Sequence, residues 1–125
     1  MTPPLTLASK SLTRRAVLDG AGVTYEAAGS GVDEDAVKAD LLAKGATPRE
    51  VAQALAERKA LAISAGRPGL VIGADQTLDF EGRLYDKVET TAQARERLKT
   101  LRGKPHDLYS ATAVARDGAI VWRET

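Results

Sequence analysis

A short basic segment near the N-terminus is the first place in the sequence where side chains are suited to chemistry. The run Ser9 to Ser11 precedes a helical pattern whose first turn carries Arg14 and Arg15. Helix N-termini have free amides and partial positive charge, so acidic residues are the usual choice there. A phosphate would meet amides, hydroxyls and guanidinium groups together at this point. Two interpretations remain open: an anion site, or a surface helix with two solvated arginines.

Helical spacing distinguishes Arg14 from its neighbour. Arg14, Val17, Leu18 and Ala21 follow the i, i+3, i+4, i+7 rule, which places them on one face. This spacing predicts that Arg14 lies at the edge of a buried stripe, whereas Arg15 points elsewhere.

Lys59 is the second candidate, because it interrupts an apolar helix face. Thr47 to Glu50 forms a capping-box pattern with Pro at the first helical position, which predicts a helix to about Ala65. On that helix Val51, Leu55 and Lys59 share one stripe. The lysine either reaches water along its alkyl stem or places its ammonium in a cleft, where it would bind phosphate.

Acidic residues at two places could hold a metal or act as a base. Asp75 follows the apolar run Leu70 to Ala74, and ligands in open α/β sheets bind beyond the carboxyl ends of strands. It is suited to metal coordination or general-base work, or it caps a turn. The run Asp33 to Asp35 offers hard oxygen ligands for Mg²⁺, although such a run is typical of a solvated loop. Lys87 follows a strand and could reach a cleft, although an exposed lysine after a turn usually has no such role.

The elements that would position these residues alternate between strand and helix. This alternation predicts a single α/β domain over residues 1–125, a central sheet flanked by helices, with a strand order that the sequence leaves open. We expect strands at Leu5–Ala8, Tyr25–Ala28 and Leu70–Ala74, two strand pieces within Leu78–Tyr85, helices at about 11–21, 47–65 and 91–101, and a hairpin at Leu108–Trp122. The stretch from Asp33 to Lys44 is poorly periodic, and we expect it to be irregular and mobile.

Composition excludes several function classes. A net charge of +1 and 4% aromatic residues argue against a nucleic-acid-binding protein. Without Cys and with one His, the chain has no disulfide, no thiolate nucleophile and no histidine-rich metal site. No apolar run is long enough to span a membrane, and residues 1–8 lack the pattern of an export signal. A cytoplasmic location is therefore expected.

The common nucleotide-binding and hydrolase motifs are also absent. There is no G-x-x-x-x-G-K-[ST] phosphate loop, and Gly20 to Gly22 lacks the third glycine of the dinucleotide fingerprint. His106 and Ser110 could suggest a hydrolase pair, but no third member is evident, which favours a structural histidine.

Taken together, the candidate residues and their neighbours resemble the Maf family of nucleoside triphosphate pyrophosphatases. The resemblance covers nearly the whole chain and rests on an ordered set of motifs rather than on any one of them. These motifs are Leu7 to Arg15, Val32 to Glu34, Lys59 with Ala60, Ile72 to Gln76, Lys87, and Leu101 to His106.

The resemblance implies a mixed α/β fold related to the inosine triphosphate pyrophosphatases. It also implies hydrolysis of a nucleoside triphosphate between its α and β phosphates, with Mg²⁺ or another divalent cation as cofactor and non-standard or surplus nucleotides as substrates. By position, Glu34 and Asp75 would bind the metal and Asp75 would act as the catalytic base. The substrate-binding residues would be Ser9, Arg14, Lys59, Lys87 and Gln76.

Several positions depart from the family pattern. Leu12 and Val88 stand where prolines are usual. Thr13 replaces an arginine common in members that act on dTTP and UTP, and Gln76 stands where those have Thr. This combination is more similar to the branch that prefers 7-methyl-GTP.

The resemblance also implies that a C-terminal segment is missing. In the family this segment supplies a further substrate-facing glutamine, more sheet and an Ala-Gly-x-Tyr motif. The alternative to an enzyme is therefore a catalytically inactive nucleotide-binding or cell-division-linked interaction module. A homodimer would be in keeping with the family.

Overall fold

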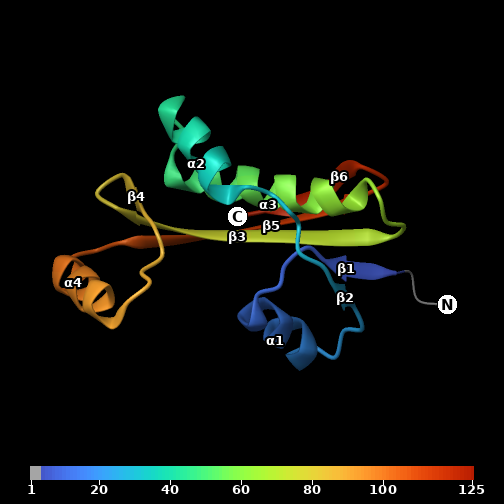
Figure 1. Cartoon of the computed structure of the whole chain (residues 1–125), viewed down its shortest axis with the longest axis horizontal. Coiled ribbons are helices and arrows are strands. Elements are labelled where there is room, and N and C mark those ends of the chain that lie inside the picture. The colour runs from blue at the N-terminus through green and yellow to red at the C-terminus, as the bar shows by residue number, and fades with distance from the viewer. Residues whose placement is uncertain (1–3) are drawn as a thin grey trace.

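The fold was analysed in a computed structural model that describes residues 4–125; Met1 to Pro3, part of the segment considered above for an export signal, lie outside the described residues. The elements along the chain are β1 (Leu5–Leu7), α1 (Leu12–Gly20), β2 (Glu26–Ala27), α2 (Glu34–Ala43), α3 (Pro48–Ser64), β3 (Leu70–Phe80), β4 (Arg83–Tyr85), α4 (Thr91–Leu101), β5 (Asp107–Arg116) and β6 (Ala119–Glu124). Figure 1 shows α2 and α3 on one side of the sheet and α1 on the other.

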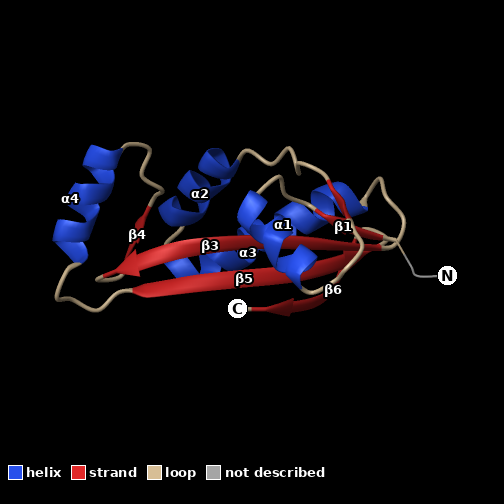
Figure 2. Cartoon of the chain, turned by 90° about the horizontal axis from the view of Figure 1, so that it is seen from below, coloured by secondary structure: helices blue, strands red, loops and turns tan. Residues whose placement is uncertain are grey.

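The sheet is mixed, as the resemblance implied. Its strand order is β2-β1-β3-β5-β6, and β4 pairs with the far end of β3. β1 runs parallel to both β2 and β3, whereas β3, β5 and β6 pair antiparallel in sequence. The long β3 and β5 strands form the centre of the sheet (Figure 2). The predicted α/β architecture with a central sheet flanked by helices is therefore confirmed.

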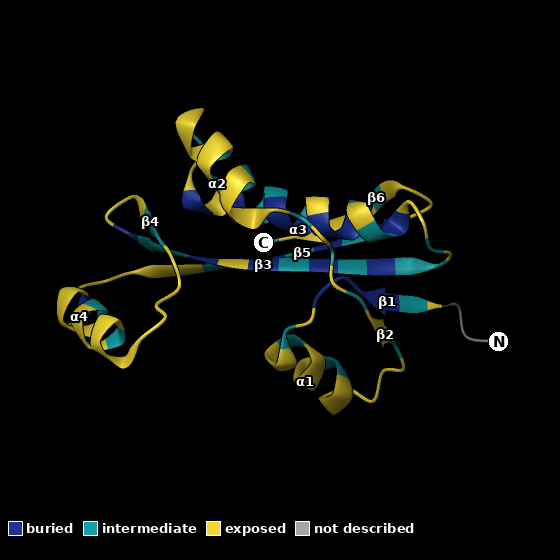
Figure 3. Ribbon diagram, viewed as in Figure 1, coloured by how far each residue is buried: buried dark blue, intermediate teal, exposed yellow. Residues whose placement is uncertain are grey.

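The core lies between α3 and the two long strands. The buried side of α3 is rich in alanine, and it packs on Val71 of β3 and on the alternate alanines of β5 from Ala111 to Ala115. Small side chains on both surfaces allow the helix to approach the sheet closely. Figure 3 shows this arrangement, with the buried side of α3 against the sheet, while α1 and α4 are largely exposed.

Gly73 is the point of closest approach between α3 and β3. A Cβ at this position would lie 2.1 Å from the Ala56 carbonyl oxygen and 2.6 Å from the Ala60 amide nitrogen. Both are backbone atoms, so the helix itself would have to move. We expect Gly73→Ala to lower the free energy of unfolding by roughly 3 kcal/mol or more, measured by urea denaturation. Gly66→Ala is the matched control, because a Cβ there meets nothing within 4 Å, and equal midpoints for the two variants would contradict this packing.

The stretch predicted to be irregular between Asp33 and Lys44 is instead a helix, α2. Asp33 caps it by accepting a hydrogen bond from the Ala36 amide, and Glu34 and Asp35 occupy its first turn. Carboxylates there complement the positive end of the helix dipole. The stretch lacks a continuous apolar stripe, so its periodicity favours a loop, but the acidic run marks a helix start.

β3 is longer than predicted, and this changes the position of Asp75. The strand continues through Asp75 to Phe80, paired with β5 as far as Asp79. Asp75 and Thr77 continue the alternation that turns every second side chain toward α3. The prediction that Asp75 ends a strand was therefore wrong, because the sequence pattern stopped at the last apolar residue whereas the backbone pairing did not.

The prediction of a buried apolar stripe on α1 was also wrong in part. Arg14 and Leu18 are half-buried, but Val17 is 67% exposed and Ala21 is exposed as well. The helix lies beside the two short strands β1 and β2 at the edge of the sheet, so little apolar surface is available to cover it. Among residues 4–125, no helix has the length and apolar character needed to cross a membrane.

Candidate functional site

A cleft of about 900 Å³ opens where β1 ends beside the middle of β3. β1 pairs with β3 only from Leu5 to Leu7, opposite Leu70 to Ile72. After Ala8 the chain leaves the sheet toward α1, so β3 continues without a parallel neighbour on that side. The cleft brings together all seven residues that the resemblance assigned to the site: Ser9, Arg14, Glu34, Lys59, Asp75, Gln76 and Lys87.

Lys59 joins the two carboxylates at the floor of this cleft. Its ammonium nitrogen lies 2.7 Å from Glu34 Oε1 and 3.1 Å from Asp75 Oδ1, and it also donates to the Ala74 carbonyl oxygen at 3.2 Å. The side chains of Lys59 and Asp75 are only 6% and 11% exposed. An ammonium has three hydrogens, and three oxygens accept them here. Lys59 therefore enters the cleft rather than reaching bulk water, and it holds the carboxylates together.

The charges around Glu34 determine its ionisation. Partial burial alone would raise the pKa of this carboxyl, but the hydrogen bond and charge of Lys59, together with the charges of Lys87 and Lys38, lower it below its ordinary value of 4.5. Glu34 is thus held ionised, as a metal ligand must be. The charge of Lys87 acts on the Glu34 carboxyl as well, so the two residues belong to one electrostatic cluster.

This lowered pKa makes a prediction about acid pH. The Glu34–Lys59 interaction should contribute to the free energy of unfolding above pH 4.5, the unperturbed value, and the contribution should be lost as pH falls through the lower folded-state pKa. A carboxyl ¹³C NMR titration should show Glu34 titrating below an exposed glutamate. In Lys59→Met its pKa should rise, and a Glu34 that titrates at or above the exposed residues in the wild type would contradict the arrangement.

The start of α1 forms a second side of the cleft. Ser11 caps the helix by accepting from the Arg14 amide, and the buried Ser9 hydroxyl accepts from the Ser11 amide at 3.0 Å and from Arg14 Nη1 at 3.4 Å. The guanidinium is thereby directed toward the cleft, next to the free amides of the helix N-terminus. This geometry favours the anion-site interpretation of the basic segment over two solvated arginines, for Arg14 at least.

Gln76 and Lys87 lie on the outer parts of the cleft. Gln76 is exposed on β3, and its Oε1 accepts from the Ser110 hydroxyl at 2.9 Å across the β3–β5 pair. Ser110 therefore partners Gln76, and His106 lies in the loop before β5. Lys87 follows β4 in the segment that leads to α4.

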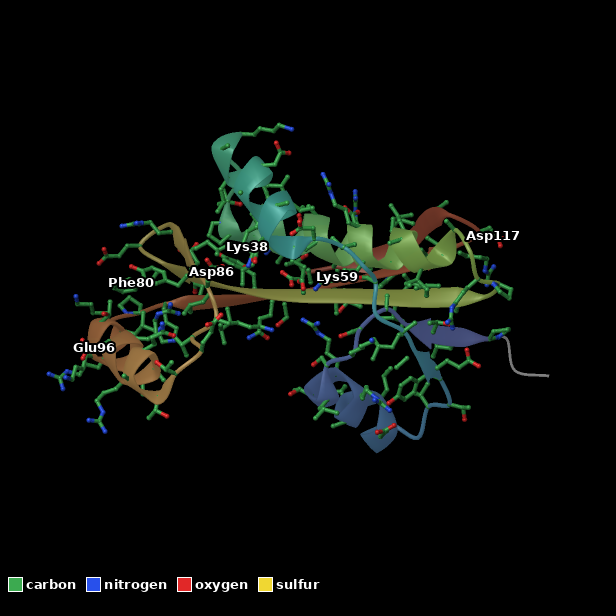
Figure 4. The ribbon with its side chains drawn as sticks, in the orientation of Figure 1. Lys38, Lys59, Phe80, Asp86, Glu96 and Asp117 are labelled. Carbon is green, nitrogen blue, oxygen red and sulfur yellow. The ribbon has the colours of Figure 1, made fainter. Side chains whose placement is uncertain are left out.

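The sequence analysis missed an ion pair that lines the cleft, formed by Lys38 and Asp86. Lys38 donates to Asp86 Oδ1 at 2.9 Å and lines the cleft one helical turn after Glu34 (Figure 4). The available signal was the i, i+4 spacing of Glu34 and Lys38, which places both on one helix face. It could be used only once the stretch was recognised as helical.

The sequence profile of the family described as Maf-like protein matches residues 4–125. The chain belongs to the Maf family. It is 59% identical over 120 residues to a nucleoside triphosphate pyrophosphatase of Caulobacter vibrioides, a match that covers 96% of this chain and 60% of that protein.

Two further Maf-family relatives carry a more specific name. A 7-methyl-GTP pyrophosphatase of Brucella abortus is 47% identical, and one of Rhizobium meliloti is 44% identical, each over 124 residues that cover 98% of this chain and 62% of the relative. The chain thus spans about three fifths of the length of these relatives.

Proposed function

We propose that this Maf-family chain hydrolyses a nucleoside triphosphate between its α and β phosphates, giving a nucleoside monophosphate and pyrophosphate. The observation that carries the proposal is the pair of carboxylates, Glu34 and Asp75, held on one ammonium inside a cleft rimmed by Arg14 and Lys87. The names of the Caulobacter and Brucella relatives support the same reaction.

The cations of the cleft would hold the polyphosphate. Arg14, with the amides at the start of α1, is suited to one end of the phosphate chain because a guanidinium pairs with phosphate oxygens in a bidentate manner. Lys87 would neutralise charge from the opposite rim. These contacts also stabilise the additional charge that develops on the departing pyrophosphate.

The two carboxylates would hold the divalent cation. No group of three or more Asp, Glu, His or Cys within residues 4–125 is arranged to bind a metal. Mg²⁺ is commonly bound by one or two carboxylates together with water and substrate phosphates, so Glu34 and Asp75 fit it. When bound, Mg²⁺ would polarise the phosphate oxygens. Lys59, which now occupies both carboxylates, would keep them close together before the cation arrives.

Asp75 would also accept the proton of the attacking water. Its Oδ1 is bound to Lys59, which leaves Oδ2 for the proton. The water oxygen would form a bond to the α phosphorus, the bond from that phosphorus to the α–β bridging oxygen would break, and pyrophosphate would leave. Hydrolysis in ¹⁸O water tests which phosphorus is attacked. We expect the label in the nucleoside monophosphate. Label in inorganic phosphate, formed together with a nucleoside diphosphate, would overturn the proposed cleavage.

For the base, we infer a preference for 7-methyl-GTP. Thr13 and Gln76 depart from the residues of the dTTP and UTP branch, and the Brucella and Rhizobium relatives are named 7-methyl-GTP pyrophosphatases. The test is kcat/KM across 7-methyl-GTP, GTP, dTTP, UTP, CTP and ITP. A higher value for dTTP or UTP than for 7-methyl-GTP would overturn this assignment.

A further inference from the structure

An ion pair joins two parts of the cleft rim that are distant in sequence. Lys38 on α2 and Asp86 after β4 are 48 residues apart, and their side chains meet at 2.9 Å. Figure 4 shows both labelled side chains facing each other between α2 and the segment that follows β4. The Lys38 side chain is 23% exposed and that of Asp86 is 69% exposed, so the lysine packs into the rim while the carboxylate lies at the surface.

One face of α2 therefore makes two contacts with the cleft. Glu34, at the start of the helix, reaches Lys59 on α3, and Lys38 one turn later reaches Asp86. Burial would lower the pKa of Lys38, but Asp86 and the charges of Asp75 and Asp35 raise it above its ordinary value of 10.5. Lys38 is thus charged at neutral pH.

Asp86 begins a segment that is tied at its far end, where the Glu89 and Thr90 amides donate to Gln93 Oε1 at the start of α4. Residues 86–90 form neither helix nor strand, and β4 before them is a three-residue strand paired to the end of β3. Lys87, the next residue along, is one of the cations assigned to the substrate phosphates. The ion pair at Asp86 therefore connects this segment to α2 immediately before Lys87.

We propose that the Lys38–Asp86 pair is a clasp that positions Lys87 over the cleft, so that Lys38 and Asp86 act as positioning residues for triphosphate binding. The proposal rests on the proposed function for the identity of the ligand. Ordering a flexible side chain and loop on binding reduces affinity, and a clasp that orders them beforehand avoids this reduction. The clasp also accounts for a charged pair at the rim that the hydrolysis itself does not require.

The test is a double-mutant cycle of Lys38→Met and Asp86→Asn, repeated in a Lys87→Met background. We expect each single change to raise KM for the triphosphate roughly three- to tenfold with a smaller effect on kcat. The KM of the double variant should not exceed that of the more affected single variant. In the Lys87→Met background, neither Lys38→Met nor Asp86→Asn should change KM. Lys44→Met is the matched control, because Lys44 caps the C-terminal end of the same helix and pairs with Asp40 outside the cleft.

Two results would overturn the clasp. If Lys38→Met weakens binding while Asp86→Asn does not, Lys38 contacts the phosphates itself. If both effects persist in the Lys87→Met background, the pair does not act through Lys87.

A parallel measurement separates failure of the clasp from failure of the proposed function. The affinity of each variant for inorganic tripolyphosphate, by calorimetry, reports on the phosphate cradle without turnover. If the wild type turns over and the variants keep its KM and its tripolyphosphate affinity, only the clasp is overturned. Tripolyphosphate binding that follows the expected cycle without wild-type turnover overturns the enzyme alone, and absence of both binding and turnover overturns both.

Discussion

Replacement of Asp75 by Asn is expected to lower kcat for pyrophosphate release by roughly 10²- to 10⁴-fold while the fold is retained. Asparagine has nearly the same shape, so packing against α3 changes little. The amide cannot accept the proton of the attacking water, and it is a weaker ligand for Mg²⁺ than a carboxylate. Lys59 keeps Glu34 and the Ala74 carbonyl as acceptors, and the asparagine amide oxygen takes the place of Asp75 Oδ1. Steady-state kinetics measure kcat, and circular dichroism of the same preparation shows whether the fold is retained.

Asp79→Asn is the matched control for this variant. Asp79 lies on the same strand, its carboxylate accepts from the Gly82 amide, and it does not line the cleft. Its replacement should leave kcat within about twofold of the wild type, because no charge in the cleft changes. Equal rates for wild type and Asp75→Asn would remove Asp75 from the chemistry.

Lys59→Met should have the largest effect on stability. The substitution leaves the Asp75 carboxylate, only 11% exposed, without its cationic partner. Loss of one member of a buried pair typically lowers the free energy of unfolding by about 3–5 kcal/mol. Methionine fills a similar volume on the apolar stripe of α3, so the expected loss is electrostatic rather than a packing defect. Urea denaturation at neutral pH measures it.

A second substitution distinguishes this explanation from general disruption of α3. In Lys59→Met, the further change Asp75→Asn should restore part of the lost stability, because the buried charge is removed. Lys99→Met, which breaks an exposed pair with Glu96, should cost less than about 1 kcal/mol. If Lys59→Met unfolds at the same urea concentration as the wild type, the ammonium does not hold Asp75 as described.

Much of the fold could be predicted because its local signals are strong. Thr47, Pro48 and Glu50 form a complete capping box in the structure, and α3 begins at Pro48 as predicted. The hairpin turn at Asp117 and Gly118 has two positive φ angles, which its sequence anticipated. Caps and tight turns depend on neighbouring residues alone, and for this reason they can be recognised without tertiary structure.

The errors arose where distant contacts determine structure. β3 extends past its apolar run because β5 pairs with it as far as Asp79. The inward face of α2 mixes the half-buried Val37 and Leu41 with Glu34 and Lys38. These two charged residues pair with Lys59 and Asp86, so the apolar stripe is interrupted. Hydrophobic periodicity detects neither the extension of β3 nor α2. The first depends on backbone pairing, and the second is held by ion pairs between elements.

The sequence identifies the site residues, but it does not reveal the contacts that position them. Their identities came from chemical type and from the family resemblance, and the structure places them all at one cleft. The rule that ligands bind beyond strand ends selected Asp75 as the end of its own strand. The strand that ends at the cleft is instead β1, and Asp75 lies within β3. That Lys59 would bind both carboxylates was not foreseen, since an ammonium in a phosphate site was expected to face the ligand.

Pyrophosphate release by the folded wild-type chain, with Mg²⁺ and with EDTA, tests the central claim most directly. With 7-methyl-GTP as substrate, we expect release that requires Mg²⁺ and that equals the nucleoside monophosphate formed, and we expect it to be lost in Asp75→Asn. Folded protein that binds the nucleotide without releasing pyrophosphate would contradict the account and would favour an inactive nucleotide-binding module.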